Sequence, residues 1–274
     1  MESKLNRIEM NSHMGVRVAL LATLALCASP LRASAGATPL LEVLGRTGRS
    51  VEQFWGRFPE VTCQESVLQT KLEKSGRIIY QQETQFDYLV MAETSSEDLA
   101  VAESRQVKRQ TGKEKHLPLL VTNGFSMMML VFHPFYQGSF EFSPPVDDVL
   151  DGKPVLRIDF QHLKGRRSPS VLQLRGRNYP LDWKGTAWID TQTWSIRRIV
   201  AGLAEPMEDV GLRTLHCDVQ YAPVHFSTST DVYWLPQVAE IEAETLRQHW
   251  RNVHHFSDYR RFSTDVKEQQ KDQP

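Results

Sequence analysis

The chain has 274 residues with 32 basic and 33 acidic side chains, which gives a formal net charge of −1 at pH 7. This balance argues against nucleic acid as the main partner, because nucleic-acid-binding domains carry a clear excess of Lys and Arg. The length allows one substantial hydrophobic core or two small ones.

The first 35 residues have the pattern of a secretory signal peptide. Basic residues precede the apolar run Val18–Ala28, which is too short to span a bilayer, and Ala33-Ser34-Ala35 is a small-residue cleavage site. We expect a start at Met1 or Met14, cleavage near Ala35, and a periplasmic or secreted product. The mature chain then carries a formal charge of −3.

Cys63 and Cys217 remain after cleavage. In an oxidising compartment an even pair is a disulfide candidate, and it would close a long loop and stabilise the fold by about 2–4 kcal/mol. The alternative is two buried free thiols that pack as small apolar residues. The sequence leaves both alternatives open.

The first helix is predicted over residues 40–58, where apolar side chains recur at spacings of three and four. Gly45 and Gly48 weaken its middle. A strand near 66–73, a hairpin turn at Ser75-Gly76 and a strand over 78–90 with a period of two follow.

A second helix is predicted over Gly124–Phe132, before Pro134 ends it. It is apolar on all sides, so it must be buried or lie over an apolar surface. Methionine fills irregular core gaps, and this packing role is favoured, but methionine also suits promiscuous apolar ligands. If the helix is a ligand lid, its candidate ligand-binding residues are Phe125, Met128, Met129 and Phe132.

Strand patterns resume after this helix. They cover residues 140–143, 155–163, 184–190, 195–202, 212–226 and 231–245. No repeat of fixed period and no low-complexity linker divides the sequence. We therefore predict a single α+β domain over residues 36–274, with a large antiparallel sheet and few helices.

Short runs in the C-terminal half resemble the LolA/LolB and RseB-type lipoprotein-carrier fold. These runs are Gly185–Asp190, Thr193, Ile196–Ile199 and Trp234-Leu235-Pro236. The resemblance implies a strongly curved sheet, a half-barrel, whose concave face is covered by helices, and the apolar Gly124–Phe132 helix suits such a cover. Nearly the whole chain also resembles a group of secreted acidobacterial proteins, through Val61–Glu65 and Phe256–Phe262, and this group implies no activity.

Familiar catalytic and cofactor motifs are absent from the sequence, so we predict no catalytic residues, no cofactor and no metal site. An acidic segment could hold calcium, but it is typical of an ordinary turn: Asp147, Asp148, Asp151 and Gly152. Glu240, Glu242 and Glu244 alternate along one strand, a pattern typical of a solvated face.

The stretch 247–266 is rich in His and aromatic residues and is predicted to be the last strand. On a strand, His249 and His255 face one side, and His254 faces the other side with Asp258. A zinc ion needs three or four converging ligands, so structural roles are favoured for these residues. A hydrolase or metalloenzyme site around the four residues is the remaining enzymatic hypothesis.

A basic cluster could contact anionic lipid headgroups or a phosphorylated glycan, although a solvated loop is favoured. Its members are Lys164, Arg166, Arg167, Arg175 and Arg177. The leading hypothesis is an exported non-enzymatic protein that binds an apolar or amphipathic ligand, such as a lipid acyl chain or a lipoprotein. The alternative is a structural or interaction module that contacts an anionic envelope surface through its basic clusters.

Overall fold

The computed structural model describes residues 38–58, 61–94, 99–111, 122, 124–174, 176–227 and 229–261. They belong to one compact unit that spans residues 37–274. The predicted signal peptide with its cleavage site, Arg175 and Phe262 lie outside the described residues.

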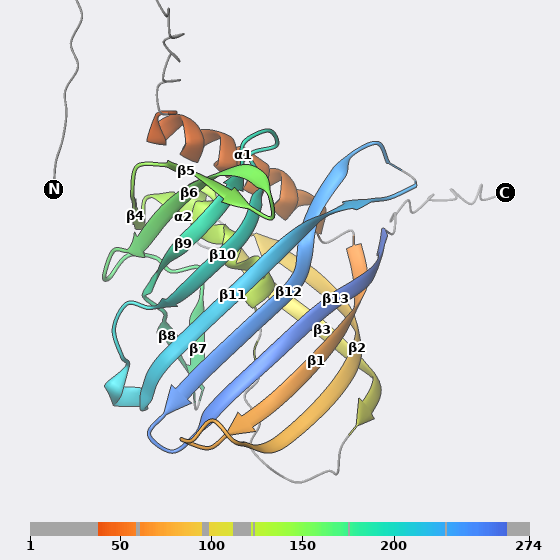
Figure 1. Cartoon of the computed structure of the whole chain (residues 1–274), viewed down its shortest axis with the longest axis vertical. Coiled ribbons are helices and arrows are strands. Elements are labelled where there is room, and N and C mark those ends of the chain that lie inside the picture. Colours follow the sequence, from red (N-terminus) through yellow and green to blue (C-terminus); the bar gives the residue numbers. More distant parts are fainter. Residues whose placement is uncertain are drawn as a thin grey trace, which may run out of the picture. The chain divides into compact units, whose positions relative to one another are not determined.

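Eleven strands form one antiparallel sheet in the order β3-β2-β1-β13-β12-β11-β10-β9-β6-β4, with β5 paired to β6 (Figure 1). The strands are β1 Val61–Leu72, β2 Ile78–Thr94, β3 Leu99–Thr111, β4 Phe140–Phe142, β5 Val146–Leu150, β6 Lys153–His162, β9 Trp183–Asp190, β10 Ile196–Leu203, β11 Leu212–His225, β12 Val232–Thr245 and β13 His249–Arg261. A separate hairpin consists of β7 Val171–Leu174 and β8 Arg177–Pro180.

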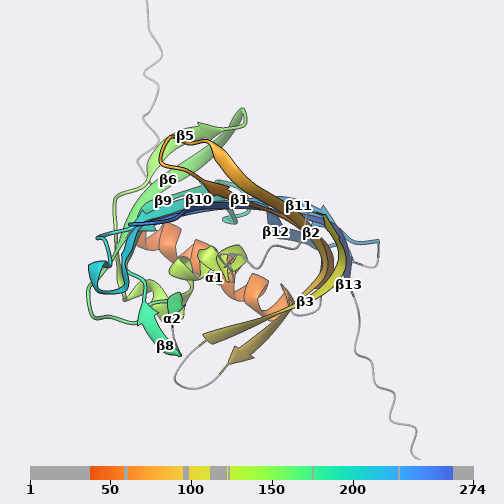
Figure 2. The same ribbon diagram turned by 90° about the horizontal axis from the view of Figure 1, so that it is seen from below.

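The sheet bends into an arch, and the helices lie on its concave side (Figure 2). They are α1 Leu40–Arg57, η2 Phe125–Phe132 and α2 Pro134–Gln137, while a short turn, η3 Glu208–Val210, precedes β11. The predicted fold class is confirmed: a large curved antiparallel sheet carries an N-terminal helix and an apolar covering helix.

The core lies between the concave face and these helices. Strand residues alternate between this core and solvent, as in β11, where Leu215, Cys217 and Val219 are buried. Gly48, predicted to weaken α1, lies where α1 packs closely against η2 and α2. A Cβ at Gly48 would lie 2.8 Å from Gln137 Nε2 and 3.4 Å from the Phe132 carbonyl oxygen.

The structure also differs from the prediction in several elements. The predicted last strand is present as β13, although it lies inside the sheet, where it pairs with both β1 and β12. Strand β1 begins at Val61, and β3, β5 and the β7–β8 hairpin were not predicted. The two runs Val61–Glu65 and Phe256–Phe262 come from β1 and β13, and their described residues pair directly, with Glu65 opposite Phe256.

Candidate functional site

The concave face is covered by η2, whose residues Ser126–Phe132 are all buried. It contacts α1 and α2 on one side and β10, β11 and β12 on the other. Phe132 packs edge-on against Phe160, and the ring of Phe125 packs against Trp183. The four candidate ligand-binding residues are therefore brought together in one segment, where they fill the core.

The backbone of η2 is less regular than the predicted α-helix. It consists of 3₁₀ turns that meet at Met127, whose φ of −100° and ψ of 16° are not helical. The bonds from Met127 N to Gly124 O and from His133 N to Leu130 O span three residues. A 3₁₀ helix has poorer hydrogen-bond geometry than an α-helix and rarely exceeds four residues, so packing rather than backbone bonding holds η2 in place.

A pocket of about 170 Å³ opens between α1 and the sheet and reaches η2 at Met129. Its other walls include Phe54 of α1, Ile196 of β10 and Tyr233 of β12. Sites for small molecules usually enclose about 300–1,000 Å³. The space beside Met129 is therefore smaller than such a site while η2 lies on the sheet.

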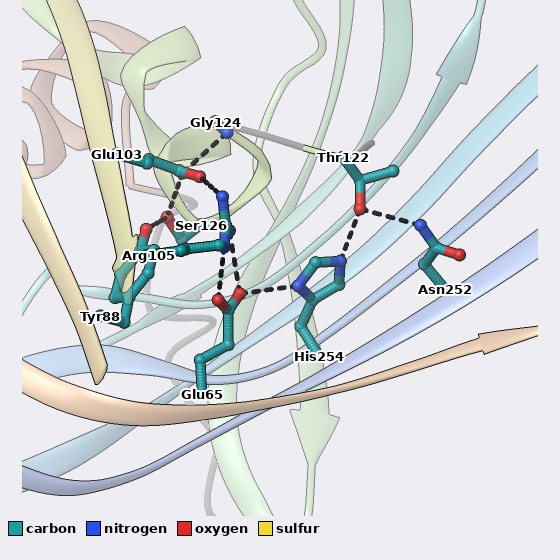
Figure 3. Close-up of polar contacts among 9 residues, drawn as sticks. All are labelled: Glu65, Tyr88, Glu103, Arg105, Thr122, Gly124, Ser126, Asn252 and His254. Atoms are coloured by element: carbon teal, nitrogen blue, oxygen red, sulfur yellow. Dashed lines mark hydrogen bonds and ion pairs between the residues drawn. The ribbon is translucent and has the colours of Figure 1, made fainter. Parts of the chain in front are cut away.

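A buried polar network lies at the N-terminal end of η2, within the otherwise apolar concavity (Figure 3). Its centre is the carboxylate of Glu65 on β1, which has no exposed surface. Arg105 on β3 donates to this carboxylate from Nε at 2.5 Å and from Nη2 at 2.9 Å. The Nδ1 atom of His254 on β13 lies 2.7 Å from Oε1 of the same carboxylate.

The network continues from His254 to Thr122, whose Oγ1 lies 2.6 Å from Nε2, and Asn252 Nδ2 donates to this hydroxyl at 3.1 Å. An ionised Glu65 can only accept, so His254 must donate from Nδ1. Thr122 therefore connects His254 to Asn252, and contacts run without a break from Asn252 to Glu65.

The charges of the network support an ionised Glu65. Burial alone would raise the pKa of Glu65, but hydrogen bonds from His254 and Arg105, with the charge of Arg105, lower this pKa below its ordinary value. Burial opposes the charge of Arg105, yet its hydrogen bonds to Glu65 and the charge of Glu103 raise the pKa of the guanidinium. Buried charges of this kind are tolerated only when they are paired.

Glu103 on β3 connects the network to η2. Its side chain is 2% exposed, and Oε2 lies 2.6 Å from Arg105 Nη1. Its Oε1 accepts from Gly124 N at 2.7 Å and lies 3.5 Å from Ser126 Oγ. Ser126 also contacts the Tyr88 hydroxyl at 3.1 Å. The start of η2 is therefore attached to β2 and β3 by polar contacts. Tyr221 of β11 also donates to Ser126 O at 3.1 Å, and Gln137 Nε2 donates to Phe132 O at 2.7 Å, while the side chains of Met127–Phe132 pack among apolar neighbours.

Glu65, His254 and Thr122 have the connectivity of a carboxylate, a base and a hydroxyl nucleophile. However, Thr122 is only 6% exposed, and its hydroxyl already accepts from Asn252. A substrate carbonyl cannot approach a hydroxyl buried to this degree. In this conformation the three residues hold segments together rather than present a nucleophile.

The other histidines of β13 do not join this network. His249 lies 2.5 Å from Glu242 on the outer face, and His255 is exposed. The expectation that Asp258 shares a face with His254 is wrong, because a β-bulge places Asp258 and Tyr259 opposite Cys63. Asp258 has a φ of 51° at this bulge and is exposed.

Cys63 and Cys217 are buried free thiols in the structure. Two strands, β13 and β12, lie between their strands β1 and β11. Neighbouring strands are about 4.8 Å apart, so strands separated by two others are too far apart for a disulfide, which needs Cα atoms within about 7 Å. Cys63 and Cys217 therefore do not form the disulfide that the sequence allowed. Burial raises the pKa of both thiols to about 12.

The remaining charged segments lie outside the concave face. Asp151-Gly152 forms the β5–β6 turn, with φ of 50° and 72°, while Asp147 and Asp148 belong to β5. Glu240 and Glu242 pair on the outer face with Arg251 and His249. Within the described part of the chain, no group of three or more His, Cys, Asp or Glu residues could hold a metal ion, and no helix is long and apolar enough to cross a membrane.

The basic cluster is divided between two places. Lys164, Arg166 and Arg167 are exposed in the loop after β6, and Arg167 stacks on Phe135 with 4.3 Å between Cζ and the ring centre. Arg177 is exposed at the start of β8. Of the described members of the cluster, three therefore lie in one loop and Arg177 lies in the β7–β8 hairpin that follows it.

No protein-family model and no curated protein matches the sequence. Solved structures with a similar fold include a LolA superfamily protein from Nitrosomonas europaea, at 11% identity and a TM-score of 0.35, with 83% of this chain and 95% of that chain covered. A DUF1329 family protein from Desulfovibrio piger matches at 11% identity and a TM-score of 0.40, with 84% of this chain and 94% of that chain covered. An outer membrane lipoprotein-sorting domain from Vibrio parahaemolyticus matches at 13% identity and a TM-score of 0.37, with 83% of this chain and 94% of that chain covered. Similarity at this level assigns no ligand to this chain.

Proposed function

We propose that the chain is an exported, non-enzymatic binding protein for an apolar or amphipathic ligand, such as a lipid acyl chain or a lipoprotein, and that η2 is a displaceable cover over the binding surface. The observation that carries the proposal is the burial of Ser126–Phe132 against the concave face of the sheet. A ligand that replaced η2 would meet the same apolar surface that η2 now covers.

Two features of η2 support its displacement. Its 3₁₀ backbone loses few strong hydrogen bonds when it moves, in contrast to the sheet strands. Its three consecutive methionines, Met127–Met129, are flexible side chains that adapt to different apolar partners. The pocket between α1 and the sheet already reaches the cover at Met129, near its middle.

The polar network contributes to the free-energy cost of opening. Glu103 accepts from the Gly124 backbone, and a hydrogen bond to a charged group contributes about 1.5–3 kcal/mol. Opening also exposes apolar surface, so an acyl ligand must provide more apolar contact than η2 does. Ligand affinity therefore depends on the closed-to-open equilibrium.

The test is binding of lauric and palmitic acid by the purified protein, measured by displacement of a fluorescent fatty acid and by thermal unfolding. At 100 times Kd, a ligand specific for the folded protein stabilises it by about 2.7 kcal/mol, which corresponds to a rise in Tm of roughly 5–10 °C. Absence of saturable binding, together with an unchanged Tm, would contradict the proposal.

A matched pair of variants tests the role of η2 in this binding. Glu103→Gln weakens the attachment of Gly124 and should raise acyl affinity by about tenfold, because less free energy is needed to open the cover. Glu240→Gln makes the same chemical change on the outer face and should leave affinity unchanged. Equal affinity for both variants would contradict the role of η2 while leaving acyl binding itself intact.

A further inference from the structure

A second pocket, of about 190 Å³, lies on the outer face of the sheet, where the β5–β6 turn meets β10, β11 and β12. Its lining is rich in polar and charged side chains and includes Asp151, Lys153, Arg197, Arg198, Trp234 and Gln237. None of these six residues belongs to the polar network or to η2.

Irregularities in the strands create this pocket. The register between β10 and β9 shifts between Ile196 and Arg198, so Arg197 and Arg198 both point away from the core while Ile196 is buried. A second shift, between β11 and β12, leaves Gln237 without a paired residue across the strands. Each shift adds one polar side chain to the outer face at the same place.

Arg197 is a largely buried cation in this pocket whose hydrogen-bond partners are incomplete. Its side chain is only 10% exposed, yet its nearest carboxylate, on Asp151, lies 3.7 Å away and is 80% exposed. Nη1 donates to the Leu150 carbonyl at 3.3 Å, and Nε is buried without a hydrogen-bond partner among the described residues. A buried cation with so few acceptors is unfavourable, and an anion in the pocket would neutralise the charge of the guanidinium.

The neighbouring charges leave room for an anion. Arg198 is already bound at both Nε and Nη2 by Asp218, at 2.9 and 2.5 Å. Lys153 is exposed, and no ion pair involves it in the part of the chain that the structure describes. Asp151 carries the opposing charge, but its exposure lets it turn into solvent. The two cations Lys153 and Arg197 therefore face a single carboxylate, that of Asp151.

We propose that this pocket binds a phosphate group, with Arg197 as the principal ligand, Lys153 as a second cation and the Gln237 amide as a donor. A guanidinium fits two oxygens of a tetrahedral anion at once, and an ammonium adds a third charged contact. The Trp234 ring, 5.8 Å from Arg197 Cζ, forms a flat wall that limits how the guanidinium can turn. The phosphate can be free or can belong to a lipid headgroup, because both present the same oxygens.

Binding of inorganic phosphate is measured by calorimetry at constant ionic strength. Binding to lipid is measured by sedimentation of the protein with phosphatidylcholine vesicles that do or do not contain phosphatidic acid. We expect saturable phosphate binding that falls at least tenfold in Arg197→Gln and in Lys153→Gln. Arg251→Gln is the matched control, since Arg251 lies on the same outer face but is paired with Glu240 at 2.7 Å. Lys153 is exposed, so Lys153→Gln tests the site even if Arg197→Gln unfolds.

The two sources of phosphate give different results. Binding to phosphatidic acid vesicles that free phosphate competes away supports a headgroup site, and phosphate binding without vesicle binding supports a site for the free anion. The proposal is overturned if neither probe binds the wild-type protein, or if Arg251→Gln weakens binding as much as Lys153→Gln does. This site does not depend on η2, so its failure leaves the proposed acyl binding untouched.

Discussion

Replacement of Glu65 by glutamine tests the polar network most sharply. The substitution preserves the size of the side chain but removes the charge that Arg105 and His254 both contact, at 2.5 to 2.9 Å. Breaking a buried ion pair costs about 3–5 kcal/mol, because the remaining charge is left without its partner. Since domains are typically stable by about 5–15 kcal/mol, Glu65→Gln should lose a large part of the free energy of unfolding.

The assay is urea unfolding of the wild type, Glu65→Gln, Arg105→Met and the double variant, followed by tryptophan fluorescence. The double variant should be more stable than the sum of the single losses predicts, by at least about 1 kcal/mol, because it removes both charges of the Glu65–Arg105 pair, while Glu103 loses Arg105 equally in the Arg105→Met single variant. A loss below about 1 kcal/mol for Glu65→Gln, or strict additivity in the cycle, would refute the description of Glu65 and Arg105 as a coupled buried pair.

The same variant has a defined pH dependence. Because the pKa of Glu65 is lowered in the folded state, its ionised form adds stability above the ordinary pKa of 4.5, and this stability is lost as the pH falls through the lower folded value. The stability difference between the wild type and Glu65→Gln should therefore be constant near neutral pH and should narrow below pH 4.5. A difference that stays constant down to pH 3 would contradict this sign.

Two further predictions concern α1 and the thiols. Gly48→Ala should destabilise the protein by about 1–3 kcal/mol, because its Cβ would displace Gln137 Nε2, which donates to Leu44 O and Phe132 O. Gly45→Ala in the same helix should instead stabilise the protein by about 0.4–1 kcal/mol. Chemical denaturation of both variants measures these two opposite changes in the free energy of unfolding. Cys63 and Cys217 should not react with a thiol reagent at pH 8 in the native protein, since both are buried and burial raises their pKa to about 12. Both should react in denaturant. If the denatured, unreduced protein has no reactive thiol, the two cysteines form a disulfide and the prediction is wrong.

Most strands were predictable because their residues alternate between core and solvent. Strand β3 was not, because two of its inward positions hold the charged residues Glu103 and Arg105, opposite Val90 and Tyr88 of β2. The early start of β1 was missed for the same reason, since Glu65 occupies an inward position there. A strand with charged residues at inward positions therefore lacks the alternation of apolar and polar residues by which strands are recognised in a sequence.

The candidate site was predictable only in its apolar part. The sequence of η2 indicated a buried apolar helix, although packing converts it into 3₁₀ turns around Met127. His254 was predicted to be structural, but its partner Glu65 is 189 residues away in sequence. No spacing rule connects such residues, because the pairing of the last strand with the first is a property of the complete sheet.

In the proposed function, an acyl ligand takes the place of η2 on the concave face. The most direct measurement is hydrogen exchange of the protein with and without saturating palmitate, followed in peptides that cover Phe125–Phe132 and, as a reference, β11 and β12. We predict faster exchange in η2 when palmitate is bound, with the strands unchanged or slower. Bound palmitate with unchanged exchange in η2 would contradict the claim.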